Sequence, residues 1–182
     1  PAGLAARVRA RFGAARETAT TAVHPELVPI GPLRLETCGA ERPAVSIVIP
    51  VYGHHEHTFN CLRSLARFTA LARVEVIVVD DASPEPAAET LDGVRGVQFL
   101  RAAVNGGFIA SCNLGAAAAR GDFLVLLNND VQVTEGWLEA LLAVFDTRPD
   151  AGLVGARLVY PDGRLQEAGG IVWRDGSAWN WG

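Results

Sequence analysis

The stretches that decide the fold are VSIVIP at residues 45–50 and VEVIVV at residues 74–79. Each is a short, almost continuous run of apolar, mainly β-branched side chains, and the first run ends at a proline. VQFL at residues 97–100 and FLVLL at residues 123–127 have the same character. Runs of this length and composition are typical of strands that are buried on both faces of a parallel sheet.

Helical patterns separate these strands. Apolar side chains recur at helical spacing over residues 59–68, and residues 85–91, 108–120 and 135–145 also favour helices. We expect Thr134 to cap the last of these helices. Strands that alternate with helices predict an α/β domain, Rossmann-like, with a mostly parallel sheet and helices on both faces.

Composition limits the function. The 182 residues suffice for one domain and a tail, and the net charge of −4 argues against a nucleic-acid partner. Three cysteines without a CxxC pair indicate a reducing compartment. No apolar run is long enough to span a bilayer.

The two ends differ from the middle. Residues 1–42 are expected to form an N-terminal helix and a proline-containing linker, before a domain at residues 43–182. The helix is either a solvated lead-in or a membrane-surface or partner-docking helix. Residues 161–163, Pro-Asp-Gly, predict a turn between two apolar runs. The chain lacks Met and ends at Trp-Asn-Trp-Gly, so we expect the domain to be truncated at its C-terminus.

Polar residues follow three of the strands, at residues 50–57, 80–83 and 128–130. Ligands of such sheets bind outside the carboxyl ends of the strands. Asp80 and Asp81 could accept hydrogen bonds from a ribose or a base, or one of them could cap the next helix. Asp130 could bind a divalent cation, or merely end its strand.

Two other groups are less specific. Gly106 and Gly107 precede a helix and would admit a phosphate or sugar close to the backbone, although a plain tight turn explains them nearly as well. The histidines of residues 54–57 diverge from one another, so a solvated loop near the ligand is favoured over a zinc site. Cys61 and Cys112 are interpreted as packing residues.

Four motifs stand in register along the chain: VSIVIPVY (45–52), VIVVDDAS (76–83), NGGFIASCNLG (105–115) and GDFLVLLNND (121–130). Together they resemble family 2 glycosyltransferases with the GT-A fold. The resemblance covers roughly residues 44–175, and residues 160–170 are similar to bacterial members that build O-antigen and other surface polysaccharides.

This resemblance implies a metal-dependent, inverting sugar transfer. The donor would be a UDP-, dTDP- or GDP-linked sugar, and the acceptor a saccharide or lipid-linked saccharide. A cytoplasmic location at the inner face of the membrane, with peripheral membrane association, is implied as well. The cofactor would be Mn²⁺ or Mg²⁺.

The resemblance also assigns roles to residues. Asp130 would bind the metal, at the position of the family's DXD motif. The residues expected to bind the donor are Pro50, Val51, Tyr52, Asp80, Asp81, Asn105, Gly107, Phe108, Asn128 and Asn129.

Two departures leave alternatives open. Asn128 stands where the first Asp of the DXD motif is usual, so one carboxylate remains. The catalytic base is unknown, since neither Glu167 nor Asp175 is identified by its spacing, and we expect it beyond residue 182. A non-catalytic module that binds a sugar nucleotide or a partner is therefore the alternative. A nucleotidyltransferase is disfavoured, because residues 52–55 contain no Lys or Arg.

We predict that this chain binds the donor but transfers little or no sugar, because we expect the base to lie beyond residue 182. A transfer assay on the purified chain checks this, and measurable transfer would contradict it.

Overall fold

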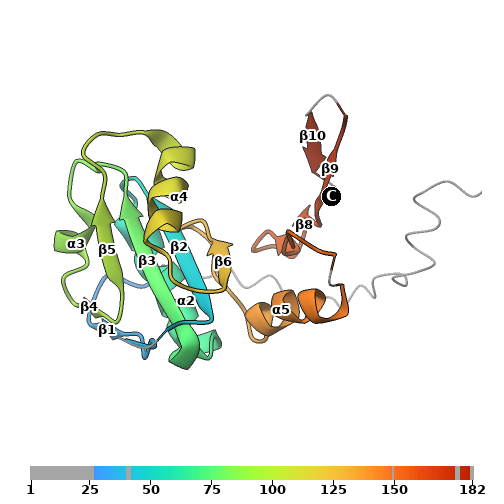
Figure 1. The fold of residues 1–182 in the computed structure, drawn as a ribbon. Coiled ribbons are helices and arrows are strands. Elements are labelled where there is room, and N and C mark those ends of the chain that lie inside the picture. Colours follow the sequence, from blue (N-terminus) through green and yellow to red (C-terminus); the bar gives the residue numbers. More distant parts are fainter. Residues whose placement is uncertain (1–26, 40–41, 149, 175–176, 181–182) are drawn as a thin grey trace, which may run out of the picture. The chain divides into compact units, whose positions relative to one another are not determined.

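The computed structural model describes residues 27–39, 42–148, 150–174 and 177–180 (Figure 1). The described residues up to Val154 belong to one compact unit, and those from Gly155 onward belong to a second. The predicted domain of residues 43–182 is therefore divided in the structure, and we describe each unit by itself.

A four-stranded parallel sheet forms the centre of the first unit. Its strands are β2 (Val45–Val51), β3 (Val74–Asp80), β5 (Gln98–Arg101) and β6 (Phe123–Leu126). They lie in the order β5-β3-β2-β6, and all three pairings are parallel. Every residue of β2 and β3 is buried, as the apolar runs predict. The predicted parallel α/β sheet is thus confirmed.

Helices cover both faces of this sheet. They are α2 (His55–Phe68), α3 (Ala87–Thr90), α4 (Gly107–Ala118) and α5 (Trp137–Thr147), with a short 3₁₀ turn at Leu71–Arg73. Alternate side chains of β2 separate the two faces: Ile47 and Ile49 join the main core, which includes Leu62 of α2, and Val48 belongs to a smaller cluster beside Ala118 of α4. No helix among the described residues has both the length and the apolar character needed to cross a membrane.

Two details refine the predicted helices. α4 lies close to the sheet because Gly115 has no side chain: a Cβ there would come within 2.3 Å of a methyl carbon of Val48. The prediction that Thr134 caps α5 is wrong. The N-cap is Gly136, with φ +74° and no side-chain hydrogen bond, so a left-handed glycine begins the helix.

Part of the predicted linker is folded. Within residues 27–39, β1 (Leu33–Arg34) pairs in parallel with β4 (Val94–Arg95), and Leu35 is only 2% exposed. The proline-containing composition did not reveal this burial, because the pairing is made with a strand some sixty residues away. The helix predicted near the N-terminus lies outside the described residues.

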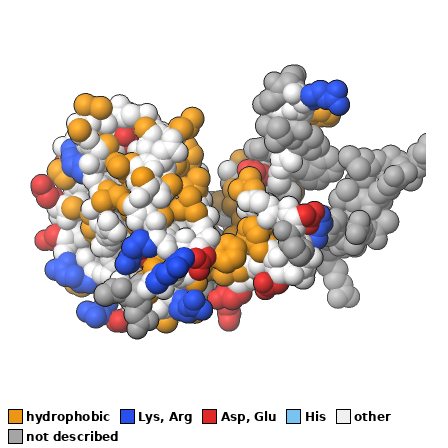
Figure 2. Space-filling model, viewed as in Figure 1, with side chains coloured by type: hydrophobic (Ala, Val, Ile, Leu, Met, Phe, Trp, Pro, Cys, Tyr) orange, Lys and Arg blue, Asp and Glu red, His pale blue; other side chains and the backbone are white. Residues whose placement is uncertain are grey.

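β6 ends the sheet on one side. Its side chains Leu124 and Leu126 are 47% and 51% exposed, and Leu114 of α4 is exposed as well. Figure 2 shows apolar side chains gathered on this side of the unit. The fourth apolar run of the sequence therefore forms a strand with one open edge among the described residues, not a fully buried one.

The described residues of the second unit form short antiparallel strand pairs. β7 (Leu158–Val159) pairs with β8 (Leu165–Glu167), and β9 (Gly170–Val172) pairs with β10 (Ala178–Asn180). The Gly163 amide donates to the Tyr160 carbonyl at 2.8 Å, which closes the turn predicted at residues 161–163.

A buried carboxylate holds the amino ends of the strands together. Glu75, 7% exposed, accepts hydrogen bonds from the Ser46 hydroxyl (2.6 Å) and from the Arg120 amide (2.7 Å) and Nε (2.9 Å). The Gly121 amide in turn donates to the Ser46 hydroxyl at 2.8 Å. Burial by itself raises the pKa of Glu75, but the bonds from Ser46 and Arg120 outweigh it and hold the pKa below its ordinary value.

We predict that Glu75→Gln lowers the free energy of unfolding at pH 7 by about 2 kcal/mol, because an amide accepts these bonds less well than a charged carboxylate. The native pKa of Glu75 lies below its ordinary value of 4.5. Its contribution is therefore complete above that pH and is lost as the pH falls through the native pKa. Urea unfolding of both proteins between pH 3 and 7 measures this. The exposed Glu135→Gln is the control, and a difference that does not shrink at low pH would contradict the prediction.

Candidate donor and metal site

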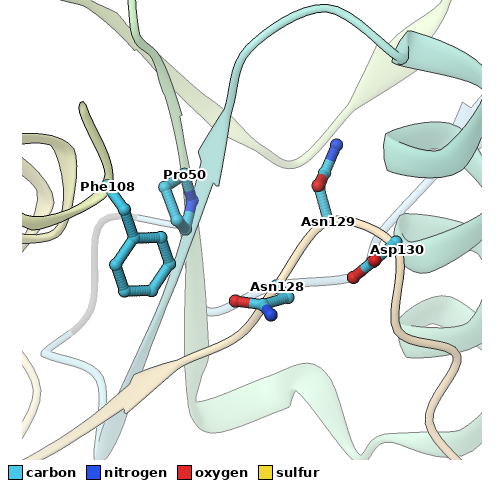
Figure 3. A pocket seen from close by; sticks show the side chains of 5 residues that line it. All are labelled: Pro50, Phe108, Asn128, Asn129 and Asp130. Atoms are coloured by element: carbon cyan, nitrogen blue, oxygen red, sulfur yellow. The ribbon is translucent and has the colours of Figure 1, made fainter.

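A pocket opens at the carboxyl edge of the sheet. It has a volume of about 440 Å³ and is lined by Pro50, Phe108, Asn128, Asn129 and Asp130 (Figure 3). These residues come from β2, from the first turn of α4 and from the turn after β6. All five are candidates from the sequence, and three chain segments bring them together because parallel strands end at one edge.

The turn after β6 presents its side chains in different directions. The Asn128 side chain points toward Pro50 and Phe108, while the Asn129 side chain leaves the chain on another side (Figure 3). Nδ2 of Asn129 donates to the Thr58 hydroxyl of α2 at 3.1 Å. Asn129 therefore supports the turn through its amide group, while the Asn128 side chain is directed toward the apolar residues of the pocket.

Asp81 fastens the start of α4. Its two carboxylate oxygens accept hydrogen bonds from the amides of Gly106 (2.9 Å) and Gly107 (2.8 Å), and the residue is 5% exposed. These amides belong to the helix N-terminus, where backbone N–H groups lack partners within the helix. Gly107 has φ +79°, which favours glycine. Since a carboxylate has further lone pairs, contact of Asp81 with a base or ribose stays a prediction.

Asp80 has a supporting environment. It is 2% exposed, accepts hydrogen bonds from the amides of Ser83 (2.8 Å) and Ala87 (2.9 Å), and forms an ion pair with Arg101. Burial by itself raises the pKa of Asp80, but these partners outweigh it and lower the pKa. The bond to Ala87, the first residue of α3, matches the helix-capping alternative. Asp80 does not line the pocket.

Arg101 is a residue that sequence reasoning missed. Its guanidinium pairs with Asp80 and also donates to the Ser83 carbonyl at 2.8 Å, so it fixes the loop that follows β3. The signal lies in the strand register, which pairs Asp80 with Arg101. An alignment of the runs at residues 74–80 and 98–101 could have found it.

The remaining donor candidates stand within three residues of Pro50 or Phe108 in the sequence but do not line the pocket. Val51 is buried at the end of β2, so its backbone is the part that a ligand could meet; its carbonyl accepts from the Asp81 amide at 2.8 Å. Tyr52 is 53% exposed directly after it. Asn105 is exposed immediately before α4. Their predicted roles toward a donor stay predictions.

One histidine of residues 54–57 differs from the predicted solvated loop, while His54 is exposed as predicted. His55 is buried at the start of α2, and its Nε2 lies 2.9 Å from the Glu85 carbonyl oxygen. The Gly53 amide donates to the Ser83 hydroxyl at 2.9 Å. These two contacts join the loop after β2 to the loop after β3. Packing of the second loop buries the ring, which a pattern of consecutive polar residues does not reveal.

Cys61 has the inert character predicted for it. Burial raises the pKa of its thiol to about 12, and the nearby charge of Asp130 raises it as well. The thiol donates weakly to the Asn128 carbonyl, with 3.7 Å between Sγ and O. A group with this pKa is not a nucleophile at neutral pH.

Oxygen atoms dominate what the pocket offers to a cation. Among the described residues no three His, Cys, Asp or Glu side chains gather as metal ligands, and Asp130 is the carboxylate at the pocket. Together with the side-chain oxygen of Asn128, this donor set fits a hard divalent cation that takes its other ligands from phosphates and water.

Comparisons with known proteins show the family to which this chain belongs. The family model described as glycosyl transferase family 2 matches residues 46–177, which is more than half of the chain. The chain therefore belongs to glycosyl transferase family 2. Among curated proteins it is 38% identical to y4gI of Sinorhizobium fredii over 144 residues, and 31% identical to the O-antigen biosynthesis protein RfbC of Myxococcus xanthus over 147 residues. Both matches cover 75% of this chain, which spans only 16% and 11% of those proteins.

Solved structures give the same fold. S. aureus TarS in complex with UDP has a TM-score of 0.51 and 22% identity, covering 58% of this chain and 32% of that one. TarS in complex with UDP-GlcNAc gives a TM-score of 0.50 over the same shares. At this identity the likeness shows the fold alone, and the fold is GT-A, as the sequence motifs imply.

We predict that Asp81→Asn lowers the free energy of unfolding by roughly 2 kcal/mol, because an amide nitrogen at one oxygen position cannot accept a bond from Gly106 or Gly107. Chemical denaturation of the protein without ligand measures this, with the exposed Asp92→Asn as the matched control. Equal stability of the two variants would show that the Asp81 contact does not hold α4.

Proposed function

We propose that this domain binds a nucleoside-diphosphate sugar together with Mn²⁺ or Mg²⁺, as the donor site of an inverting glycosyltransferase. The observation that carries the proposal is the convergence of Pro50, Phe108, Asn128 and Asp130 on one pocket at the carboxyl edge of a GT-A sheet. An apolar wall and an oxygen-rich wall suit the two parts of such a donor: the base or sugar and the diphosphate with its cation.

The chemistry follows from the leaving group. A nucleoside diphosphate gains negative charge as the bond to the sugar breaks, and a bound divalent cation stabilises that charge as a Lewis acid. Asp130 and the side-chain oxygen of Asn128 would hold the cation. Phe108 and Pro50 would pack against the donor and exclude water from it. With Asp130 committed to the cation, the base that deprotonates the acceptor hydroxyl comes from another part of the protein.

The names of the relatives support a proposal for the role of the whole protein. RfbC is named for O-antigen biosynthesis, and TarS structures contain UDP and UDP-GlcNAc. We therefore propose that the whole protein transfers sugar to a saccharide or lipid-linked saccharide in cell-surface polysaccharide synthesis. A lipid-linked acceptor would place it in the cytoplasm at the inner face of the membrane, in peripheral contact with the lipid.

A non-catalytic binding module is the second candidate. It is favoured by Asn128, which replaces a carboxylate that the DXD motif usually supplies, and by the open pocket with one carboxylate. Such a module would bind a sugar nucleotide with little help from a cation. The dependence of binding on the cation therefore separates the two candidates.

We predict that one of UDP, dTDP and GDP binds the chain only with Mn²⁺, and that Asp130→Ala weakens this binding about tenfold or more, which is ~1.4 kcal/mol. Isothermal titration calorimetry, with and without Mn²⁺, measures both. Asp146→Ala, which removes an exposed carboxylate on α5, is the control and leaves binding unchanged. Equal binding without the cation would favour the module, and no binding of any nucleotide would overturn the proposal.

A further inference from the structure

We propose that Thr58, Cys61 and Ser64 form a polar stripe on α2 that positions the turn carrying Asp130, and that Thr58 is the positioning residue on which this turn depends. The positioning itself stands on contacts within the chain. Its consequence for a nucleotide and a cation rests on the proposed function.

The stripe follows from the helical spacing. The three residues are three positions apart, so they lie along one face of α2. All three are buried: Thr58 and Cys61 are 0% exposed and Ser64 is 5% exposed. Burying a hydroxyl costs free energy unless it is hydrogen-bonded, so small polar side chains on a buried helix face indicate a specific partner.

That partner is the chain after β6. The Thr58 hydroxyl accepts from Nδ2 of Asn129 at 3.1 Å, and the Cys61 thiol donates to the Asn128 carbonyl at 3.7 Å. The Ser64 hydroxyl accepts from the Val133 amide at 3.0 Å and donates to the Cys61 carbonyl at 2.7 Å. One face of α2 therefore contacts the turn at both ends of residues 128–133.

The turn has few other restraints. The last hydrogen bond to β2 comes from the Leu127 amide, which donates to the Val48 carbonyl at 2.9 Å. Helix α5 begins only at Trp137. Within the turn, the Val131 amide donates to the Asn128 carbonyl at 3.3 Å. Asp130 is exposed, and no described residue hydrogen-bonds its carboxylate. Its place at the pocket is consequently set by how its neighbours are held, and Asn129 is the adjacent residue.

Thr58 is the informative position to change. Valine has nearly the shape of threonine but lacks the hydroxyl. The Asn129 side chain is half-buried, so its freed amide can bind water and the fold loses little. Ser64→Ala would instead leave the buried Val133 amide without a hydrogen-bond acceptor and destabilise the whole unit. Thr58→Val therefore separates positioning of the turn from overall stability.

The first test uses the protein without nucleotide. Within residues 127–133 the amides of Leu127, Val131 and Val133 are hydrogen-bonded, and their hydrogen exchange is expected to become about fivefold to tenfold faster in Thr58→Val, the effect of one lost hydrogen bond. Thr58→Ser keeps the hydroxyl and restores the slow exchange. Thr90→Val is the matched control, because the Thr90 hydroxyl bonds only within its own segment, to the Pro86 carbonyl at 3.1 Å.

The second test follows Mn²⁺-dependent UDP binding by calorimetry in the same four proteins. Thr58→Val is expected to weaken it by a similar factor, with a melting temperature no lower than that of Thr90→Val, while Thr58→Ser binds normally. The positioning role is overturned if Thr58→Val leaves the exchange of residues 127–133 unchanged, or if Thr58→Ser behaves like Thr58→Val. If the unsubstituted protein does not bind UDP, the one of dTDP and GDP that it binds takes its place in this test. If it binds none of the three, the proposed function is overturned, and the exchange measurement still decides the role of Thr58.

Discussion

The parallel pairing of β2 with both β3 and β6 is the constraint on which the rest of the structure depends. Val48 is paired with Ile77 on one side and with Leu126 on the other. Because all three strands run in the same direction, their carboxyl ends and the loops that follow them meet at one edge. Burial on both faces fixes the register, since a shift by one residue would exchange the side chains facing α2 and α4.

Asp80 and Asp81, two adjacent aspartates at this edge, hold different parts of the structure. Both are nearly inaccessible, so each must find hydrogen-bond donors. Asp80 forms an ion pair with Arg101 and accepts a hydrogen bond from the start of α3. Asp81 accepts hydrogen bonds from the amides at the start of α4. Each carboxylate thus anchors a different helix to the end of β3. Phe108 lies in the first turn of α4 and lines the pocket. Its position therefore depends on the hydrogen bonds between Asp81 and the amides at the start of α4.

The pocket offers few side chains that could hold a cation. Its single carboxylate lies on a turn that is held from α2, and its apolar wall comes from α4 and β2. The cation proposed for this pocket would have so few protein ligands that it would need the phosphates of a nucleotide to complete its coordination. Binding of the cation and of a nucleotide would then be mutually dependent, which suits a donor site that releases the diphosphate after the sugar has left.

The sequence by itself predicted the parallel sheet and the order of its helices, because short apolar runs are local signals. The polar residues after the strands indicated Pro50 and residues 128–130, and the resemblance to the family added Phe108, so the five residues that line the pocket are among the candidates. It did not show which of Asp80 and Asp81 holds the start of the next helix, since adjacent carboxylates look alike until the strand register supplies Arg101 to one of them. Nor did it reveal the burial of Leu35 or the hydrogen bond between Asn129 and Thr58. These depend on contacts between segments distant in the chain, and only the tertiary structure decides which partners a buried side chain meets.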